Sequence, residues 1–177
     1  MRKIKLYISM SLNGKIAARD GGVDWLEAIP NPEKLDYGYA NFYESIDTSI
    51  QGNVTYQQII NWDIEFPYKG IKNFVLTRNP NYQNSEHVEF VAANHIPFIQ
   101  HLKRQEGKDI WLIGGGQINT RLLQAKLIDE LRVFVMPIII PSGIGLFEDF
   151  PPQTQLQLQH SETYPTGVVE LKYGILR

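Results

Sequence analysis

The sequence predicts an α/β fold with a largely parallel central sheet, because candidate strands alternate with candidate helices along most of the chain. The run of residues 110–113 is entirely apolar, as is typical of a strand buried on both faces. Beyond it, Ile118, Leu122 and Leu123 repeat at helical spacing. After Pro151 and Pro152 the pattern changes to two strictly alternating segments, from which we expect an antiparallel hairpin at the edge of the sheet.

Each element rests on a local pattern and a boundary signal. Residues 3–10 alternate and end in Asn13-Gly14, which predicts a strand and a turn. Asn31-Pro32 is a typical helix start, and an apolar face from Leu35 to Ile46 follows it. The other candidate strands cover residues 48–51, 73–77, 88–92, 110–113 and 130–140, and the hairpin covers 154–164 and 168–176. The other candidate helices cover residues 53–60, 94–106 and 118–127.

Composition narrows the class of protein. A chain of 177 residues is about one domain long, so we expect a single domain over 1–177. Seventeen Lys and Arg against nineteen Asp and Glu give a net charge of -2, which favours neither nucleic acid nor an anionic membrane as partner. Cysteine is absent, and four dispersed histidines are expected at the surface, so we predict no metal. No stretch approaches the roughly 20 apolar residues of a membrane span, and we expect a soluble, cytoplasmic protein.

The stretch "DIWLIGGGQINTRLL", residues 109–123, places three glycines between a strand and a helix. Glycines at such a junction let the backbone approach a ligand, and the free N–H groups of the helix attract a phosphate. A tight turn is the alternative reading, and the residues alone leave both open. The stretch matches neither GxGxxG nor the Walker pattern.

Two other segments end strands in a comparable way. Gly52-Asn53-Val54-Thr55 joins a strand to a helix, and Leu76-Thr77-Arg78 places a hydroxyl and a guanidinium at a strand end. Arg78 can pair with a phosphate, although alone it is better explained as a solvated turn residue. Three such ends together favour a long, multiply anionic ligand, and we expect a dinucleotide.

Several segments in order resemble the dihydrofolate reductase-like fold: "SLNGKIA", "GNVTY", "VLTR", "IWLIGGGQI" and "LIDELRVFVMPIIIPSGIGLFE". They are most similar to the C-terminal reductase domain of riboflavin-biosynthesis deaminase-reductases and its stand-alone relatives. The resemblance covers nearly the whole chain. It implies a three-layer sandwich around an eight-stranded, mostly parallel sheet whose last strand is antiparallel. It also implies NADPH across the strand ends and a homodimer, for which "VFVMPIII" is a candidate apolar edge.

Carried over by position, the resemblance assigns cofactor binding to Ala17, Gly52, Asn53, Val54, Thr55, Leu76, Thr77, Arg78, Gly114, Gly115, Gly116, Gln117 and Ile118. Two positions depart from the family pattern. Asn53 replaces the arginine of "GRxTY", so a preference for NADPH over NADH rests mainly on Arg78. Asn13 replaces an aspartate, which keeps the turn propensity and removes the charge, and we favour a structural role for it.

Substrate contacts are harder to assign. The acidic residue by which dihydrofolate reductases bind a pterin has no match here. Asp36 is the nearest carboxylate, and a solvated helix charge explains it equally well. Trp25 either stacks on a flat heterocycle or belongs to the core. The remaining candidates for the substrate pocket are Ser11, Asp24 and Tyr56.

The resemblance implies an NADPH-dependent reductase of a small pterin- or pyrimidine-like heterocycle, of the dihydrofolate reductase or 5-amino-6-(5-phosphoribosylamino)uracil reductase type. A hydride donor near the acceptor and a proton source are what that chemistry needs. The alternative is a dinucleotide-binding module of the same fold without turnover. We expect no fused deaminase, because no cysteine or zinc signature is present.

Overall fold

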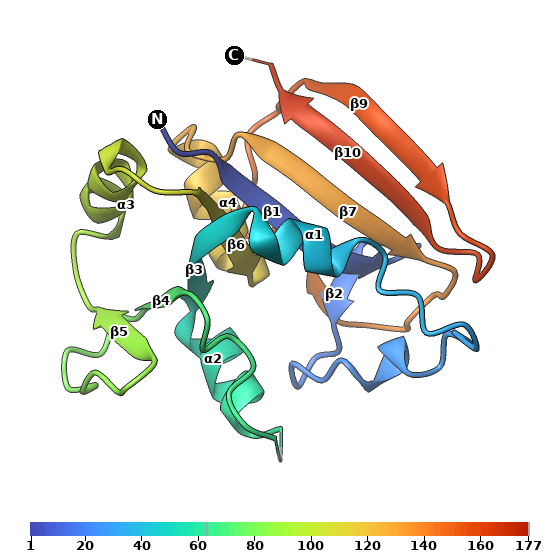
Figure 1. Ribbon diagram of the computed structural model, residues 1–177, viewed down its shortest axis with the longest axis horizontal. Helices are drawn as coiled ribbons and strands as arrows, with labels where there is room; N and C mark the ends of the chain where they lie inside the picture. The colour runs from blue at the N-terminus through green and yellow to red at the C-terminus, as the bar shows by residue number, and fades with distance from the viewer. Residues whose placement is uncertain (63, 177) are drawn as a thin grey trace.

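A central sheet with helices on both faces forms the body of the computed structural model, which describes residues 1–62 and 64–176 (Figure 1). The strands of this sheet are β1 (Ile4–Ser11), β3 (Ile46–Gly52), β4 (Lys72–Leu76), β5 (Val88–Val91), β6 (Asp109–Gly114), β7 (Glu130–Met136), β9 (Leu156–Thr163) and β10 (Val169–Ile175). They lie in the order β5-β4-β3-β6-β1-β7-β10-β9. Two further short strands, β2 (Lys15–Ala17) and β8 (Ile144–Gly145), pair with each other.

The direction of the strands confirms the predicted architecture. The neighbouring pairs from β5 to β7 are all parallel. β10 is antiparallel to both β7 and β9, so the C-terminal hairpin closes the sheet at one edge. Parallel neighbours place their carboxyl ends along one side of the sheet, where open α/β sheets bind ligands.

The helices are α1 (Tyr39–Glu44), α2 (Asn53–Ile60), α3 (His95–Arg104) and α4 (Gly116–Gln124), with a 3₁₀ turn η1 (Asp24–Leu26). Ile99 of α3 and Leu122 of α4 pack with strand residues such as Leu112 in the larger core cluster. Phe42 of α1 packs with Trp111 in a separate cluster. α1 and α4 therefore cover opposite faces of the sheet, as Figure 1 shows.

The predicted helix over residues 32–46 is the clearest error of the sequence reading, since α1 begins only at Tyr39. Lys34 and Tyr37 have φ angles of 52° and 53°, which an α-helix does not contain. The Asn31 carboxamide instead closes a turn, because it both accepts from Leu35 N and donates to Leu35 O at 2.9 Å. Asn31-Pro32 is thus a turn signal in this chain.

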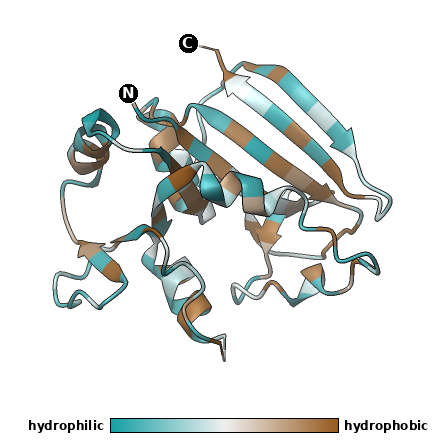
Figure 2. Cartoon of the chain, viewed as in Figure 1, coloured by the Kyte–Doolittle hydropathy of each residue, from teal (hydrophilic) through white to brown (hydrophobic). Residues whose placement is uncertain are grey.

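The C-terminal part of the sheet differs from expectation in two ways. The first half of the segment "VFVMPIII" belongs to β7, which lies between β1 and β10 and offers no edge. The true edge is β9, and all eight of its residues are exposed, so the hairpin is wet on more than one face. In Figure 2 the hairpin extends beyond the helices, which explains why its outer strand is uncovered.

Candidate functional site

Three strand-to-loop junctions predicted from the sequence lie side by side. β4, β3 and β6 are consecutive in the sheet, and Gly52 at the end of β3 is in register with Leu76 at the end of β4. On the other side of β3, Gln51 is in register with Gly114 at the end of β6. The sequence therefore identified segments that the fold brings to one edge.

Two of the three consecutive glycines are required by the fold itself. Gly114 has a φ of +117°, in the region that favours glycine. Gly116 has an ordinary backbone, but a Cβ there would lie 2.5 Å from Gly145 O and 2.6 Å from the Glu148 side chain. The turn reading of the sequence thus accounts for Gly114 and Gly116.

Gly115, which is joined to Gly114 by a cis peptide bond, differs from its two neighbours because neither its φ angle nor the atoms around it require glycine. Its φ and ψ are −73° and −173°, which other residues adopt, and it is the N-cap of α4 without a side-chain cap. A Cβ there would meet only Thr55 Oγ1, at an ordinary 3.4 Å. The open space above Gly115, beside the free N–H groups at the start of α4, fits an anionic group that must approach the backbone.

The starts of α2 and α4 converge at this point. A Cβ on Gly52 would lie 3.1 Å from the Ile118 side chain, so α4 packs closely on the end of β3. Val54, in the first turn of α2, is 72% exposed, and Thr55 lies beside Gly115. Two uncapped helix starts on either side of one glycine fit the bridging diphosphate of a dinucleotide.

Gly115 and the N–H groups that begin α2 and α4 form what we call the cradle. Arg78 is exposed just after the end of β4, on the far side of this cradle. The preceding Thr77 is buried, donates its N–H to Val91 O at 3.0 Å, and accepts at its hydroxyl from Asn79 N at 3.0 Å. The ring of His95 lies with Nε2 2.9 Å from both Thr77 O and Val91 O. His95 is buried, contrary to the expected surface position, because it fastens the loop that carries Arg78.

Asn53 occupies the position where the family pattern has arginine. Its Nδ2 donates to the hydroxyl of Tyr82 at 3.2 Å, and the Tyr82 ring stacks on Phe90 at 4.7 Å between centroids. Asn53 therefore links the start of α2 to the loop between β4 and β5. No charge accompanies this contact, so Arg78 is the guanidinium at this end of the cradle.

Several buried polar atoms around the junctions have no hydrogen-bond partner among the described residues: Gln51 Oε1 and Nε2, Asn53 Oδ1 and Asn119 Oδ1. Gln51 and Asn119 are fully buried. Burying a polar group without a partner costs about 1–3 kcal/mol, so such groups usually have a partner in a functional state. Gln51 and Asn119 were not predicted from the sequence. The available signal was a carboxamide within an apolar strand or within the apolar face of a helix.

The first loop is held by hydrogen bonds, which confirms the structural role of Asn13. Asn13 Nδ2 donates to Ile140 O at 2.8 Å and its Oδ1 accepts from Ile140 N at 3.3 Å. Ser11 is buried and its hydroxyl donates to Asn13 Oδ1 at 2.8 Å, so it is occupied within the loop. Ala17, at the end of β2, is buried against Gly143.

A cavity of about 230 Å³ lies where this loop meets residues 140–142. Asp20, Asp24 and Trp25 line it, together with Pro141 and Ser142. Trp25 also packs on the core cluster around Phe134, and its buried Nε1–H has no acceptor among the described residues. The ring of Trp25 therefore packs on the core, and its contact with a substrate stays a prediction.

Two other substrate candidates have mainly structural surroundings. Asp36 is exposed and accepts hydrogen bonds from Gly38 N at 2.9 Å and Ala40 N at 3.1 Å. These bonds, first from Ala40 and then from Gly38, lower the pKa of Asp36, so it is ionised at neutral pH. Tyr56 packs edge-on against Phe66 and Phe90. Nothing in these contacts prepares Asp36 to donate a proton.

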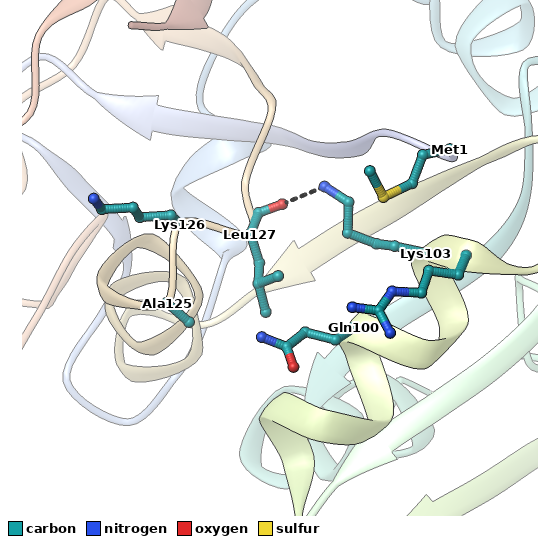
Figure 3. Close-up of a pocket in the computed structure, with 7 residues that line it drawn as sticks. Met1, Gln100, Lys103, Ala125, Lys126 and Leu127 are labelled. Atoms are coloured by element: carbon teal, nitrogen blue, oxygen red, sulfur yellow. Dashed lines mark hydrogen bonds between the residues drawn. The ribbon is translucent and has the colours of Figure 1, made fainter. Parts of the chain in front are cut away.

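A second cavity, of about 250 Å³, lies at the amino ends of the strands, opposite the glycine junctions (Figure 3). It is lined by Met1, Gln100, Lys103, Arg104, Ala125, Lys126 and Leu127. The buried Lys103 donates to Leu127 O at 2.9 Å and forms an ion pair with Asp129. Of the basic residues that line this cavity, Lys103 and Arg104 lie in the last turn of α3 and Lys126 follows the end of α4, where cations complement the helix dipole.

Among the described residues, no group of three or more His, Asp or Glu side chains is placed to hold a metal ion. In the same part of the chain, no helix is long and apolar enough to cross a membrane.

Known proteins resemble the chain along its whole length. A protein of Bacillus subtilis (strain 168), YwjB, whose activity is uncharacterized, is 35% identical over 167 residues, covering 94% of this chain and 95% of YwjB. A structure from Shewanella sp. PV-4, assigned to riboflavin biosynthesis, superposes with a TM-score of 0.87 at 26% identity and covers 100% of both chains. The dihydrofolate reductase of Enterococcus faecalis, complexed with NADP(H), gives a TM-score of 0.70 at 15% identity and covers 99% and 97%.

The last of these likenesses concerns the fold alone, and it confirms the dihydrofolate reductase-like architecture expected from the sequence. Residues 69–170 match the RibD C-terminal domain, and this range includes all of β4, β6 and α4 and only the first two residues of β10. The chain therefore belongs to the RibD C-terminal domain family.

Proposed function

We propose that the chain is a single-domain, NADPH-dependent reductase of a small pterin- or pyrimidine-like heterocycle. The observation that carries the proposal is Gly115, which lies between two uncapped helix starts and, unlike its two neighbours, has neither a positive φ angle nor a close contact that requires glycine. Membership of a reductase domain family and the NADP(H) bound to the Enterococcus faecalis neighbour support the same reading.

Each group in the cradle has a separate task in this proposal. The N–H groups that begin α2 and α4 hold the diphosphate against Gly115. Arg78 neutralises the 2'-phosphate, and His95 keeps the loop below Arg78 in place. Ala17 leaves room at the far end, where the nicotinamide would lie and supply the hydride. The Trp25 cavity, with two carboxylates and a free indole N–H, offers partners for a ring bearing amino and carbonyl groups.

The second candidate function is a dinucleotide-binding module without turnover. It is favoured by Asp36, whose carboxylate caps the start of α1, and by Asn13, whose carboxamide is occupied by Ile140. Under this reading the cradle binds NADPH while no residue supplies a proton to a substrate.

Calorimetric titration with NADPH and with NADH tests the proposal first. Selective binding of NADPH is the expected result, and failure of both dinucleotides to bind would overturn both candidate functions. A panel of dihydropterins and aminopyrimidines is then screened for turnover, with NADPH oxidation followed at about 340 nm. This screen separates the reductase from the module without turnover. A module would bind NADPH and oxidise none of it.

We also propose a homodimer. β7 is internal, so the uncovered edge strand β9, where Leu156 and Leu158 are 41% and 53% exposed, is the surface available for pairing. Light scattering at micromolar concentration tests the assembly, and a monomeric mass would contradict it.

A further inference from the structure

Asn119, in the first turns of α4, has a fixed orientation. It is fully buried, and its Nδ2 donates to Leu146 O at 2.8 Å. Because a carbonyl oxygen only accepts, the nitrogen of the carboxamide must be the atom that faces Leu146. The other end of the carboxamide is therefore an oxygen, Oδ1, which can only accept a hydrogen bond.

That oxygen has no donor among the described residues. It lies beside Gly114, since a Cβ built there would be 3.4 Å from Asn119 Oδ1 and 3.5 Å from Ile8 Cδ1. The first of the three glycines thus leaves an acceptor next to the backbone at the end of β6. A ligand that satisfies it must bring a hydrogen-bond donor.

The hydrogen bond that attaches the neighbouring loop accounts only for the nitrogen end of the Asn119 carboxamide. The same segment is already fastened by Thr120, whose hydroxyl accepts from Glu148 N at 2.8 Å without leaving a polar atom unpaired. Asn119 adds the bond to Leu146 O at the cost of an unpartnered oxygen. A structural role accounts for Nδ2 and leaves Oδ1 without one.

The strand order indicates which half of a dinucleotide would meet this oxygen. From the end of β4, which carries Arg78, the cradle crosses β3 and β6 and reaches β1, which carries Ile8. Asn119 Oδ1 and Ile8 Cδ1 both lie near the position of a Cβ on Gly114, and Ile8 belongs to β1, on the side of β6 away from Arg78. With the 2'-phosphate at Arg78, the nicotinamide half would lie there.

We propose that Asn119 is a positioning residue whose Oδ1 accepts a hydrogen bond from the carboxamide N–H of the nicotinamide. The inference rests on the proposed function and names a contact within that site. A ribose hydroxyl is the alternative donor to Oδ1, and the experiments below distinguish it from the carboxamide. Oδ1 is covered in the free protein, and the half-buried Ile8 side chain is the neighbour that must turn aside.

Calorimetric titration of the wild-type chain with two cofactors tests the contact without any substitution. The 3-acetylpyridine analogue of NADPH keeps the ring carbonyl and has no N–H to donate, whereas the thionicotinamide analogue keeps the N–H₂ group. One lost hydrogen bond in a buried site corresponds to roughly tenfold in Kd. We expect the acetylpyridine analogue to bind about tenfold more weakly than NADPH, and the thionicotinamide analogue to bind like NADPH.

The variant Asn119→Leu then identifies the protein partner, with Thr120→Val as the matched control. Asn119→Leu should bind NADPH about tenfold more weakly and no longer distinguish it from the acetylpyridine analogue. Thr120→Val loses a loop bond of the same length on the same helix and should keep the wild-type discrimination. Thermal melting of both variants shows whether each is folded.

Three outcomes would overturn the inference. Equal binding of the acetylpyridine analogue and NADPH to the wild-type chain removes the carboxamide as donor. Weaker binding of both cofactors to Asn119→Leu with unchanged discrimination assigns Oδ1 to a ribose hydroxyl. Failure of the wild-type chain to bind any dinucleotide refutes the proposed function and the inference with it, whereas the first two outcomes leave the proposed function in place.

Discussion

The two ends of the central sheet differ in how their buried polar groups are satisfied. At the amino ends of the strands, Arg2 donates to Thr48 Oγ1 at 2.7 Å and is paired with Asp47, and Lys103 is paired with Asp129. At the carboxyl ends, Gln51 and Asn119 are equally buried and leave polar atoms without a partner. The difference indicates that the first end contributes stability, and it agrees with our proposal that the second end binds a ligand.

The largest effect should follow from breaking the paired end. Lys103→Met removes a buried ammonium and leaves the Asp129 carboxylate with its bond from Ile4 N at 2.8 Å. Because removing one partner of a buried ion pair is costly, we expect the free energy of unfolding to fall by about 3 kcal/mol. Urea denaturation measures it, and NADPH affinity should be unchanged. An unaltered denaturation midpoint would show that this end is not where the stability lies.

At the carboxyl ends of the strands, substitutions of the glycines distinguish a role in stability from a role in ligand binding. Gly116→Ala places a Cβ 2.5 Å from Gly145 O, so we expect it to lower the free energy of unfolding by about 1–3 kcal/mol.

Gly115→Ala is the matched control for that substitution, because its Cβ enters open space beside Thr55. It should change stability by less than about 0.5 kcal/mol and weaken NADPH on the order of tenfold. Urea denaturation and calorimetry of the same samples give both quantities. Tight NADPH binding by Gly115→Ala would leave the three glycines as a turn.

Arg78 tests whether the exposed end of the cradle selects the cofactor. Arg78→Ala removes a charge-assisted contact to the 2'-phosphate, so NADPH should bind more weakly by about 1–3 kcal/mol. NADH, which has no 2'-phosphate, should bind as before, and stability should be unaffected because Arg78 is exposed. Calorimetry with both dinucleotides measures this. Equal weakening of the two would remove Arg78 from the 2'-phosphate.

From the sequence, the edge of the sheet that carries the candidate site could be predicted better than the side-chain contacts at that edge. Gly52, Arg78 and Gly115 were identified because a strand followed by glycine or a basic residue leaves a local pattern. Asn119 and His95 were not, since the partner of each lies on an element that is distant in the sequence. Asn31 was read as a helix start because its carboxamide serves a helix and a turn equally well.

A substitution of Gln51 should raise the free energy of unfolding, whereas a substitution at the paired end should lower it. Gln51→Met replaces two unpartnered polar atoms by an apolar chain of similar length, so the free energy of unfolding should rise by about 1 kcal/mol. The control is Asn73, a buried carboxamide on the neighbouring strand whose Nδ2 donates to three carbonyls. Asn73→Leu should lower stability by about 2 kcal/mol. If both variants are destabilised, Gln51 is satisfied within the fold and the contrast between the two ends is weaker.

Asp36 should show the smallest effect, and it tests whether this carboxylate is the proton donor. Its pKa is lowered by hydrogen bonds from Ala40 N and Gly38 N, so the carboxylate stabilises the fold above its unfolded pKa and loses that contribution as the pH falls through the folded value. Asp36→Asn should flatten the decline of thermal stability between about pH 5 and pH 3 and leave the melting temperature nearly unchanged at neutral pH.

The variant Asp36→Asn also shows whether the Asp36 carboxylate only caps α1 or donates a proton to the substrate. A general acid contributes about 10²–10⁴-fold to the rate, whereas a cap contributes nothing to the reaction itself. Because Asp36 is exposed and ionised at neutral pH, we expect Asp36→Asn to oxidise NADPH at close to the wild-type rate with any substrate that the screen identifies. A loss of a hundredfold or more would instead make Asp36 the acid, and its bonds to α1 would then serve to place the carboxylate rather than to begin the helix.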